Sequence, residues 1–254
     1  MLNINLIEHL LETESIGNYI LYFDRLDSTN SEALQLDRSK AEHGTVIITD
    51  KQEIGRGRGT NQWFSVDGKS LTFSVVIYPE FGLDQAGLVA LLAGIAVSEA
   101  LKKLLHTVHL KWPNDLIIAG RKIGGVLIES KVRQNVLQKL VIGIGLNINL
   151  DKSDFSEDLQ RNVTSIKIET GINAQRESIC ADVLNRLEYW LQQINDPEKI
   201  IAAWHGKCNH LNKTIKFHHN NEIVEGRFLG ITKTGQAQLE VDGNLISVTS
   251  RIIE

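Results

Sequence analysis

A short basic segment, residues 51–59 (KQEIGRGRG), carries the strongest signal for chemistry in the chain. Its three glycines occupy every second position, and Arg56 and Arg58 lie between them. Glycine residues such as Gly55 let a backbone approach a ligand closely. The guanidinium group of an arginine presents a fork of hydrogen-bond donors that suits a carboxylate or a phosphate. A solvated basic loop would have the same composition, so the segment alone supports both interpretations about equally. It is not a Walker loop, because no Gly-Lys-Ser/Thr sequence closes it.

A second segment, residues 111–115 (KWPND), places a lysine among apolar neighbours. Pro113 holds Trp112 in extended geometry, and the alternation of a strand turns Lys111 away from Trp112. Such a lysine is either an edge residue that discourages aggregation or a functional cation. For a lone lysine the first interpretation is favoured, since most lysines are solvated.

Two further stretches, residues 143–149 (GIGLNIN) and 122–129 (KIGGVLIE), carry pairs of glycines within predicted strands. The first lacks the third glycine and the following helix of a dinucleotide-binding fingerprint. It is typical of a strand with its glycines and Asn147 on one face. Glycine inside a strand marks a close approach by a ligand or by another part of the chain. Tight packing explains each stretch when it is taken alone.

Polar residues 27–30 (DSTN) precede a predicted helix, and Thr29 with Glu32 fits a capping box. This structural role accounts for them without any ligand. Metal and cysteine chemistry are not indicated either. Histidines and a cysteine at 205, 208 and 210 match no usual zinc spacing, and two cysteines are too few for a disulfide framework.

Composition narrows the class of protein. The chain has 254 residues and a formal net charge of −4, which argues against a general nucleic-acid binder. Its apolar stretch 88–97 is too short to span a bilayer, and the N-terminus has no basic region or cleavage site of a secretory signal. We therefore expect a cytoplasmic protein that binds neither DNA nor membrane.

The elements that must position these segments follow from the periodicity of the sequence. The longest helical pattern is apolar on more than one side, which predicts a helix buried on both faces. Residues 151–175 are polar and weakly patterned. Strands are expected at 18–26, 45–49, 70–78, 108–112, 116–118, 122–130 and 137–148, and helices at 29–36, 84–105, 176–194 and 197–205.

The C-terminal part has a different character. Four short strands are expected there, at 214–217, 222–231, 237–241 and 245–248, with hairpin turns at 220–221, 234–235 and 242–243. A unit of this size has a marginal core, so we expect it to pack on the main domain as a small β-barrel. The sequence thus predicts an α+β fold, a mixed and mostly antiparallel sheet backed by helices, with domains at 1–208 and 209–254.

Taken together and in this order, the segments resemble the biotin protein ligase (biotin–[acetyl-CoA-carboxylase] ligase) family. The match is strong over residues 20–150, and residues 162–166 (NVTSI) and the C-terminal strands extend it to most of the chain. A glycine–arginine loop is weak evidence alone, but the loop followed by KWPND at this separation is specific. The resemblance implies a biotin/lipoate ligase-like catalytic domain with an SH3-like C-terminal barrel.

The resemblance implies a reaction in two steps. Biotin and Mg-ATP give biotinyl-5′-adenylate and pyrophosphate, and a lysine of a biotin carrier protein, such as that of acetyl-CoA carboxylase, then attacks the adenylate. The residue types suit this scheme, because a carboxylate and an α-phosphate must meet and cations must offset their repulsion. Lys111, Arg56 and Arg58 are the predicted catalytic cations. Ordering of the glycine-rich loop would protect the adenylate from water.

The resemblance also implies a set of binding residues. ATP and Mg²⁺ are the expected cofactors, with Lys111 bridging the biotin carboxyl group and the α-phosphate and with Asn147 placing the magnesium ion. The predicted biotin-binding residues are Ser28, Thr29, Asn30, Gln52, Gly55, Arg56, Lys111, Gly124 and Gly125. The predicted ATP-binding residues are Arg56, Arg58, Trp63, Lys111 and Asn147.

Some features depart from the family pattern. About twenty residues precede the first predicted strand, too few for a DNA-binding domain, so we expect a monofunctional ligase, as a monomer or homodimer. Residues 59–63 (GTNQW) lack a further arginine that the family pattern often has, and Arg251 aligns only loosely with its C-terminal basic residue. The alternatives are a lipoate or octanoate ligase or transferase of the same fold, and a non-catalytic biotin sensor.

Overall fold

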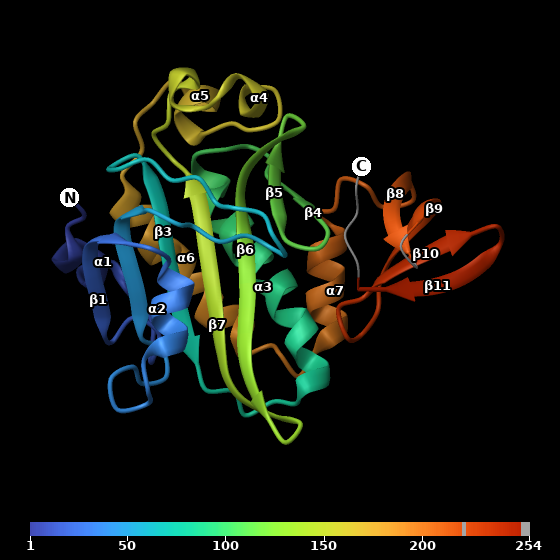
Figure 1. Ribbon diagram of the computed structural model, residues 1–254, viewed down its shortest axis with the longest axis horizontal. Coiled ribbons are helices and arrows are strands. Elements are labelled where there is room, and N and C mark those ends of the chain that lie inside the picture. Colours follow the sequence, from blue (N-terminus) through green and yellow to red (C-terminus); the bar gives the residue numbers. More distant parts are fainter. Residues whose placement is uncertain (220–221, 250–254) are drawn as a thin grey trace.

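A seven-stranded mixed sheet forms the centre of the molecule in this computed structural model, which describes residues 1–219 and 222–249 (Figure 1). The strand order is β1-β2-β3-β7-β6-β5-β4, in which β1 and β2 are parallel and the other neighbours are antiparallel. The predicted mixed, mostly antiparallel sheet is therefore confirmed. The strands are β1 (Ile20–Leu26), β2 (Val46–Gln52), β3 (Ser70–Ile77), β4 (His109–Lys111), β5 (Asp115–Ile118), β6 (Arg121–Arg133) and β7 (Val136–Asn147).

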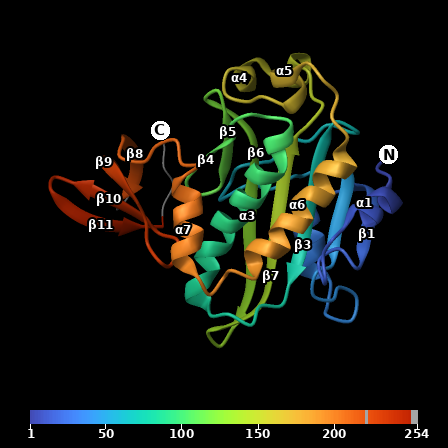
Figure 2. The same cartoon turned by 180° about the vertical axis from the view of Figure 1, so that it is seen from behind.

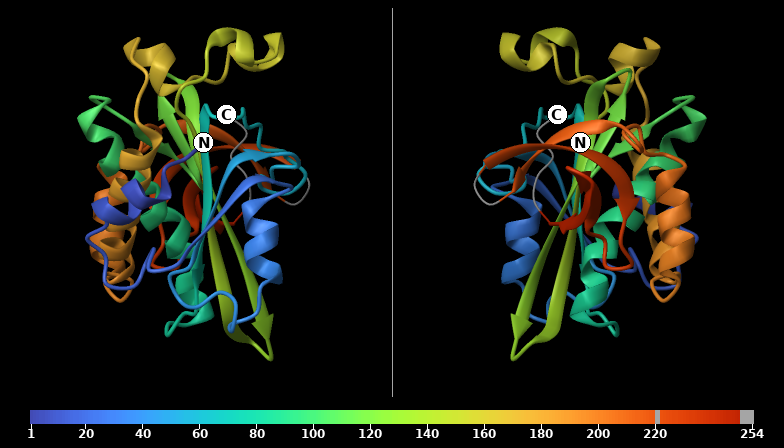
Figure 3. Two further views of the ribbon diagram at one scale, coloured as in Figure 1. Left: turned by 90° about the vertical axis from the view of Figure 1, so that its left-hand side faces the viewer. Right: turned by 90° about the vertical axis from the view of Figure 1, so that its right-hand side faces the viewer.

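Helices cover the two faces of the sheet unequally. One face carries α3, α6 and α7, and the other carries α2 and the loop between β2 and β3, which crosses in front of β7 and β6 (Figures 1 and 2). The sheet seen edge-on in Figure 3 has α2 and the larger helices on opposite sides. The helices are α1 (Ile4–Leu10), α2 (Thr29–Gln35), α3 (Ala86–Ala100), α4 (Glu157–Gln160), α5 (Ile166–Thr170), α6 (Arg176–Leu191) and α7 (Pro197–His205), with 3₁₀ turns at Leu83–Gln85, Leu101–Lys103 and Lys152–Asp154.

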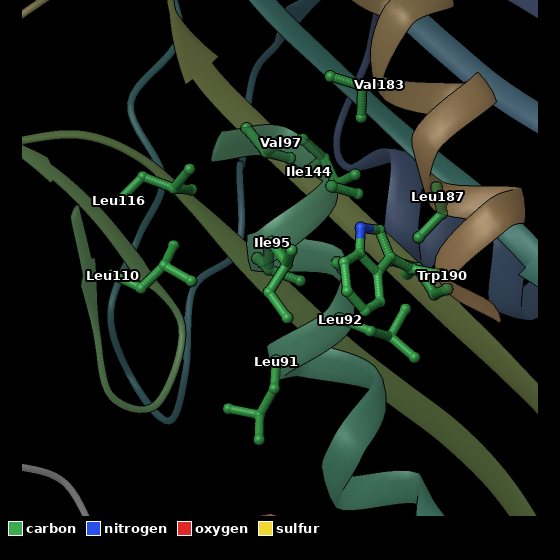
Figure 4. Packing of buried hydrophobic residues seen from close by; sticks show 14 of the residues in the cluster. Leu91, Leu92, Ile95, Val97, Leu110, Leu116, Ile144, Val183, Leu187 and Trp190 are labelled. Carbon is green, nitrogen blue, oxygen red and sulfur yellow. The ribbon is translucent and has the colours of Figure 1, made fainter. Parts of the chain in front are cut away.

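Helix α3 lies at the centre of the hydrophobic core. It packs between the sheet and α6, and Figure 4 shows Leu92 and Ile95 of α3 with Ile144 of β7 and Trp190 of α6 in one cluster. The stretch Leu83–Lys103 is long and apolar enough to cross a membrane by length and composition, but most of it is buried inside the protein. Its hydrophobicity is that of a core helix covered on both sides, as the sequence predicted.

The N-terminal segment differs from the sequence-based expectation in two ways. No helix was predicted before β1, whereas α1 begins at Ile4, after an N-cap by Asn3, and packs against α6. The cap of α2 is also shifted by one residue, because the side chain of Ser28 accepts the bond from Ser31 N. The predicted capping box with Thr29 as N-cap is therefore wrong, and this frees the Thr29 side chain for other contacts.

The C-terminal unit is an antiparallel sheet of four strands in the order β11-β10-β9-β8 (Figure 3). The strands are β8 (Thr214–His219), β9 (Glu222–Ile231), β10 (Ala237–Val241) and β11 (Asn244–Val248). The predicted SH3-like barrel is wrong for the described residues, in which β8 and β11 stay unpaired edges. The physical reason is that the apolar face of the sheet, with Phe217 and Phe228, joins the main hydrophobic core instead of closing on itself. The predicted turn at 220–221 and Arg251 lie outside the described residues.

Two close contacts fix this unit beside the main sheet. The indole nitrogen of Trp112 donates to Gly235 O at 3.1 Å. A Cβ at Gly87, in the first turn of α3, would lie 2.1 Å from Thr234 O, so only glycine allows this approach. The turn between β9 and β10 is thereby held against the KWPND segment, which connects β4 and β5.

Candidate active site

A cavity of about 500 Å³ opens on the face of the sheet that α2 covers only in part. Its volume is in the range of small-molecule sites. The β2–β3 loop, the start of α2, the β4–β5 turn and the glycine faces of β6 and β7 form its walls. Of the predicted site residues, Ser28, Thr29, Asn30, Gln52, Arg56, Arg58, Trp63, Lys111 and Gly125 line it.

One end of the cavity is a buried network of small polar groups. Thr29 donates its hydroxyl to Gln52 Oε1 at 3.0 Å, and its backbone nitrogen donates to the same atom at 2.8 Å. Ser74 Oγ lies 2.7 Å from Thr29 Oγ1 and 2.6 Å from Asn30 Oδ1. These groups are almost inaccessible to solvent, so their hydrogen bonds fix donors and acceptors in place before any ligand binds.

The glycines of β7 make room for two of these side chains. A Cβ at Gly143 would lie 2.1 Å from Asn30 Oδ1, and one at Gly145 would lie 2.6 Å from the indole ring of Trp63. The close approach that glycine permits is therefore made by side chains that line the cavity, rather than by a bulge. Trp63 Nε1 is buried without a hydrogen-bond partner in the described part of the chain, which leaves a donor for a ligand.

The predicted anion-binding loop has a defined hairpin conformation. Gly57 N donates to Asn61 O and Trp63 N donates to Gly55 O, both at 2.9 Å. Gly55 does not line the cavity, but a Cβ there would lie 2.3 Å from Trp63 O. Its contribution is to let the two arms of the hairpin approach each other.

The two arginines of this hairpin reach different parts of the molecule. Arg56 forms an ion pair with Glu129 of β6 at 2.7 Å and donates to Ser31 Oγ at 3.3 Å. Arg58 lies at the other side and donates to Thr249 O, after β11, at 3.5 Å. The hairpin thus spans from the polar end of the cavity to the C-terminal unit.

Two lysines line the cavity, Lys111, which was predicted as a site residue, and Lys122, which was not. Lys111 lies on β4, an edge strand, and still faces the cavity, so it is at once an edge residue and a cation of the site. Lys122 of β6 forms an ion pair with Asp115 at 2.5 Å. A Cβ at Gly125 would lie 3.5 Å from Cε of Lys122 and from Oδ1 of Asp115, so this pair lies over the glycine.

Two further predicted site residues do not line the cavity. Gly124 points into the core, where a Cβ would lie 2.4 Å from Leu146, because successive residues of a strand face opposite sides. Asn147 is buried and donates from Nδ2 to Thr164 O at 3.0 Å. That contact holds the segment 162–166 (NVTSI) in place. In turn, Thr164 N donates to Lys122 O at 2.8 Å, so Asn147 indirectly supports the strand that carries Lys122.

The cysteine and histidine at positions 208 and 210 are largely buried and are not arranged as a metal site. In the described ranges 1–219 and 222–249 no group of three His, Cys, Asp or Glu side chains could hold a metal ion. Burial, with a smaller effect of the Lys111 charge, lowers the pKa of His210 to about 4. Burial also raises the pKa of the Cys208 thiol to about 11, so neither the imidazolium nor the thiolate forms near neutral pH.

This fold and cavity define the class of biotin and lipoate ligases, and the model of the Biotin/lipoate A/B protein ligase family matches residues 22–147. The Bifunctional ligase/repressor BirA of Escherichia coli is 31% identical over 231 residues, which cover 89% of this chain and 71% of that protein. Its namesake in Bacillus subtilis is 29% identical over 249 residues, 96% of this chain and 76% of the relative. The chain belongs to the biotin protein ligase family.

A solved structure extends the similarity to the whole fold. The biotin protein ligase from Aquifex aeolicus in complex with biotin and ATP has a TM-score of 0.77 and is 27% identical, with 91% of this chain and 95% of that chain covered. The fold predicted from the sequence, except for the closed barrel, is therefore confirmed.

Proposed function

We propose that this chain is a biotin–[acetyl-CoA-carboxylase] ligase, which uses ATP to activate biotin as biotinyl-5′-adenylate and transfers the biotinyl group to a lysine of a carrier protein. The observation that carries the proposal is one cavity with a neutral polar end and a cationic end. A neutral cyclic urea needs fixed donors and acceptors, while its distant carboxylate and the nucleotide phosphates need cations.

Biotin occupies the polar end in this proposal. Thr29, Asn30 and Gln52 recognise the ureido group, and Ser28 keeps the helix start that carries Thr29 in place. Gly125 lets the Lys122–Asp115 pair lie close to β6, which leaves the rest of the cavity for the ring system and the valeryl chain. The hydrogen bonds among these residues are made without ligand, so little ordering is required when biotin binds.

The chemical step takes place where the cations converge. The biotin carboxylate attacks the α-phosphate of ATP, pyrophosphate leaves, and positive charge nearby lowers the repulsion between the two anions. Lys111 fills this role in our proposal, as the sequence suggested, and Lys122 joins it because its Asp115 contact holds it over Gly125. Arg56 and Arg58 complete the cationic end of the cavity.

The nucleotide lies beneath the hairpin loop. Trp63 offers its ring and its indole N–H, which has no partner among residues 1–219 and 222–249, to the adenylate. Arg58 ties the loop to the C-terminal unit, so that water is kept from the mixed anhydride. Asn147 does not line the cavity and its Nδ2 donates to Thr164 O, so we assign it no contact with the magnesium ion that the resemblance implied.

The acceptor lysine enters through a second cavity of about 230 Å³. Arg58, Trp112 and Asn114 line both cavities, so the second cavity lies directly beside the first. The far wall consists of small residues at the start of α3, among them Ala86 and Ala90, and of the β9–β10 turn. The partner of the enzyme is a biotin carrier domain in the cytoplasm. Of this domain, only the acceptor lysine side chain must reach the adenylate.

The test is pyrophosphate release by the purified chain with Mg-ATP and biotin, lipoate or octanoate, with mass spectrometry of the bound product. Biotin-dependent release with the mass of biotinyl-adenylate is expected. Release with lipoate or octanoate instead would assign the chain to the lipoate branch of the class. Biotin binding without release would make it a sensor.

A further inference from the structure

Glu129 lies behind the cavity wall, at the point where the polar network meets the glycine–arginine hairpin. Its Oε1 forms the ion pair with Arg56 NH2 at 2.7 Å, and its Oε2 accepts from Asn30 Nδ2 at 2.9 Å. The carboxylate is largely buried, with 19% of the side chain exposed, and it does not line the cavity. A single carboxylate thus contacts one group from each end of the site.

The contact with Glu129 fixes which way the amide of Asn30 points. A carboxylate only accepts hydrogen bonds, so the NH₂ group of Asn30 must face Glu129, and its carbonyl oxygen must face Ser74, 2.6 Å away. Asn30 Nδ2 also lies 3.3 Å from Leu127 O, a second acceptor on the same side. Amide orientation is therefore imposed by the partners and not left to the ligand.

The same carboxylate restrains Arg56. The arginine belongs to a loop with glycine on both sides, and 46% of its side chain is exposed, so the backbone alone restrains it weakly. Glu129 and Ser31 engage two of its nitrogens, and a guanidinium has five N–H donors, so donors are left for an anion in the cavity. An arginine held in this way loses less side-chain entropy when it binds an anion.

We propose that Glu129 is a positioning residue that couples biotin recognition to the anion-binding loop, by holding the Asn30 amide with one oxygen and the Arg56 guanidinium with the other. The inference rests on the proposed function, because it assigns a role within the same reaction. The proposal predicts that the effects of the Asn30 contact and of the Arg56 contact can be distinguished by different substitutions of Glu129. Glutamine keeps an acceptor for Asn30 but loses the charge that holds Arg56, whereas alanine loses both.

The experiment measures KM for biotin and for ATP in the pyrophosphate assay with Glu129→Gln and Glu129→Ala, with biotin affinity measured separately by calorimetry. Glu129→Gln is expected to raise KM for ATP by about tenfold and to change biotin affinity less than threefold. Glu129→Ala is expected to weaken biotin binding by about tenfold as well. Glu225→Gln, which removes one charge from an exposed ion pair on β9, is the matched control and should resemble the wild type.

A double-mutant cycle tests whether Glu129 acts through Arg56. In an Arg56→Ala background, Glu129→Gln should have no further effect on KM for ATP. Equal effects in both backgrounds, wild-type constants for Glu129→Gln, or a lower KM for ATP in that variant would each overturn the proposal. Absence of biotin-dependent turnover in the wild type would instead refute the proposed function, so the two failures are distinguishable.

Discussion

The indole ring of Trp63 lies directly against the backbone of Gly145, at a distance that leaves no room for a Cβ between them. The two residues come from different segments, the glycine–arginine hairpin and the central strand β7. Their contact places the end of the hairpin over the face of the sheet on which the cavity opens. A strand glycine therefore determines where the loop can close.

We predict that Gly145→Ala impairs the reaction without unfolding the protein. The new methyl group would lie 2.6 Å from the Trp63 ring, so the ring and the hairpin must shift. We expect KM for ATP to rise by at least tenfold and the melting temperature to fall by only a few degrees. Gly206→Ala is the control, because a Cβ there meets no atom closer than 3.6 Å. Wild-type kinetics for Gly145→Ala would show that the loop position is not required.

Replacing either lysine of the cavity should slow adenylate formation by orders of magnitude. Removing one preorganised charge from a transition state costs about 10²–10³-fold in rate, and we expect a loss of this order for Lys111→Ala and for Lys122→Ala. Lys131→Ala, on the exposed end of β6, serves as the control. Single-turnover formation of biotinyl-adenylate is the measurement, and circular dichroism checks the fold. A variant that retains wild-type rates would exclude its lysine from the chemical step.

Arg58→Ala should affect retention of the intermediate more than its formation. Arg58 lines both cavities and contacts Thr249 O, so it helps to cover the site. We expect biotinyl-adenylate to appear free in solution about tenfold faster than from the wild type, as followed by filtration and mass spectrometry. Arg227→Ala, which breaks an exposed ion pair with Glu240, is the control. Unchanged leakage would argue against a covering role for Arg58.

Regular elements of the main domain could be predicted because their signals are local. The sequence SLTFSVVI alternates polar and apolar residues, and it forms β3 with Thr72 and Ser74 on the cavity side. The same alternation could have identified these polar residues as part of the site, yet only the strand was predicted. Helix α1 was missed because its short sequence acquires stability from packing on α6 rather than from its own pattern.

The parts of the site that escaped prediction depend on contacts between distant segments. Whether Gly124 or Gly125 faces the cavity depends on strand register, which the sequence leaves open. Lys122 is held by Asp115 on the neighbouring strand, and the amide NH₂ of Asn147 donates to Thr164 O, which are both contacts that the strand pattern does not predict. The C-terminal sheet stays open for the same reason: its apolar face finds a partner in the main domain.

A buried ion pair beside the sheet should make stability depend on acid pH. Asp50 contacts Arg176 at 2.7 Å and accepts from Tyr22 at 2.6 Å. Burial alone would raise the pKa of Asp50, but these two partners outweigh it, and the pKa lies below the usual 3.8. A carboxyl group with a lowered pKa in the folded state binds fewer protons than in the unfolded state, so its contribution is lost as the pH falls below about 4.

Asp50→Asn should therefore lower the free energy of unfolding by about 3 kcal/mol at pH 7, since it leaves the Arg176 charge buried without its counterion. The difference from the wild type should shrink as the pH falls below about 4 and Asp50 itself becomes protonated. Urea titrations across this range provide the measurement. Asp182→Asn, which removes an exposed partner of Lys103, should cost less than 1 kcal/mol. A pH-independent difference for Asp50→Asn would contradict the assignment.

The second cavity offers a way to separate the two half-reactions. Ala90→Trp would fill the space between α3 and the β9–β10 turn without changing a residue of the first cavity. We expect biotinyl-adenylate to form at a rate close to that of the wild type, because Ala90 does not line the first cavity. Transfer to a purified carrier domain should fall at least tenfold, since the acceptor lysine can no longer approach. Ala90→Ser, which adds one atom, should leave both steps intact. If Ala90→Trp slowed adenylate formation and transfer equally, the acceptor route through this cavity would be wrong.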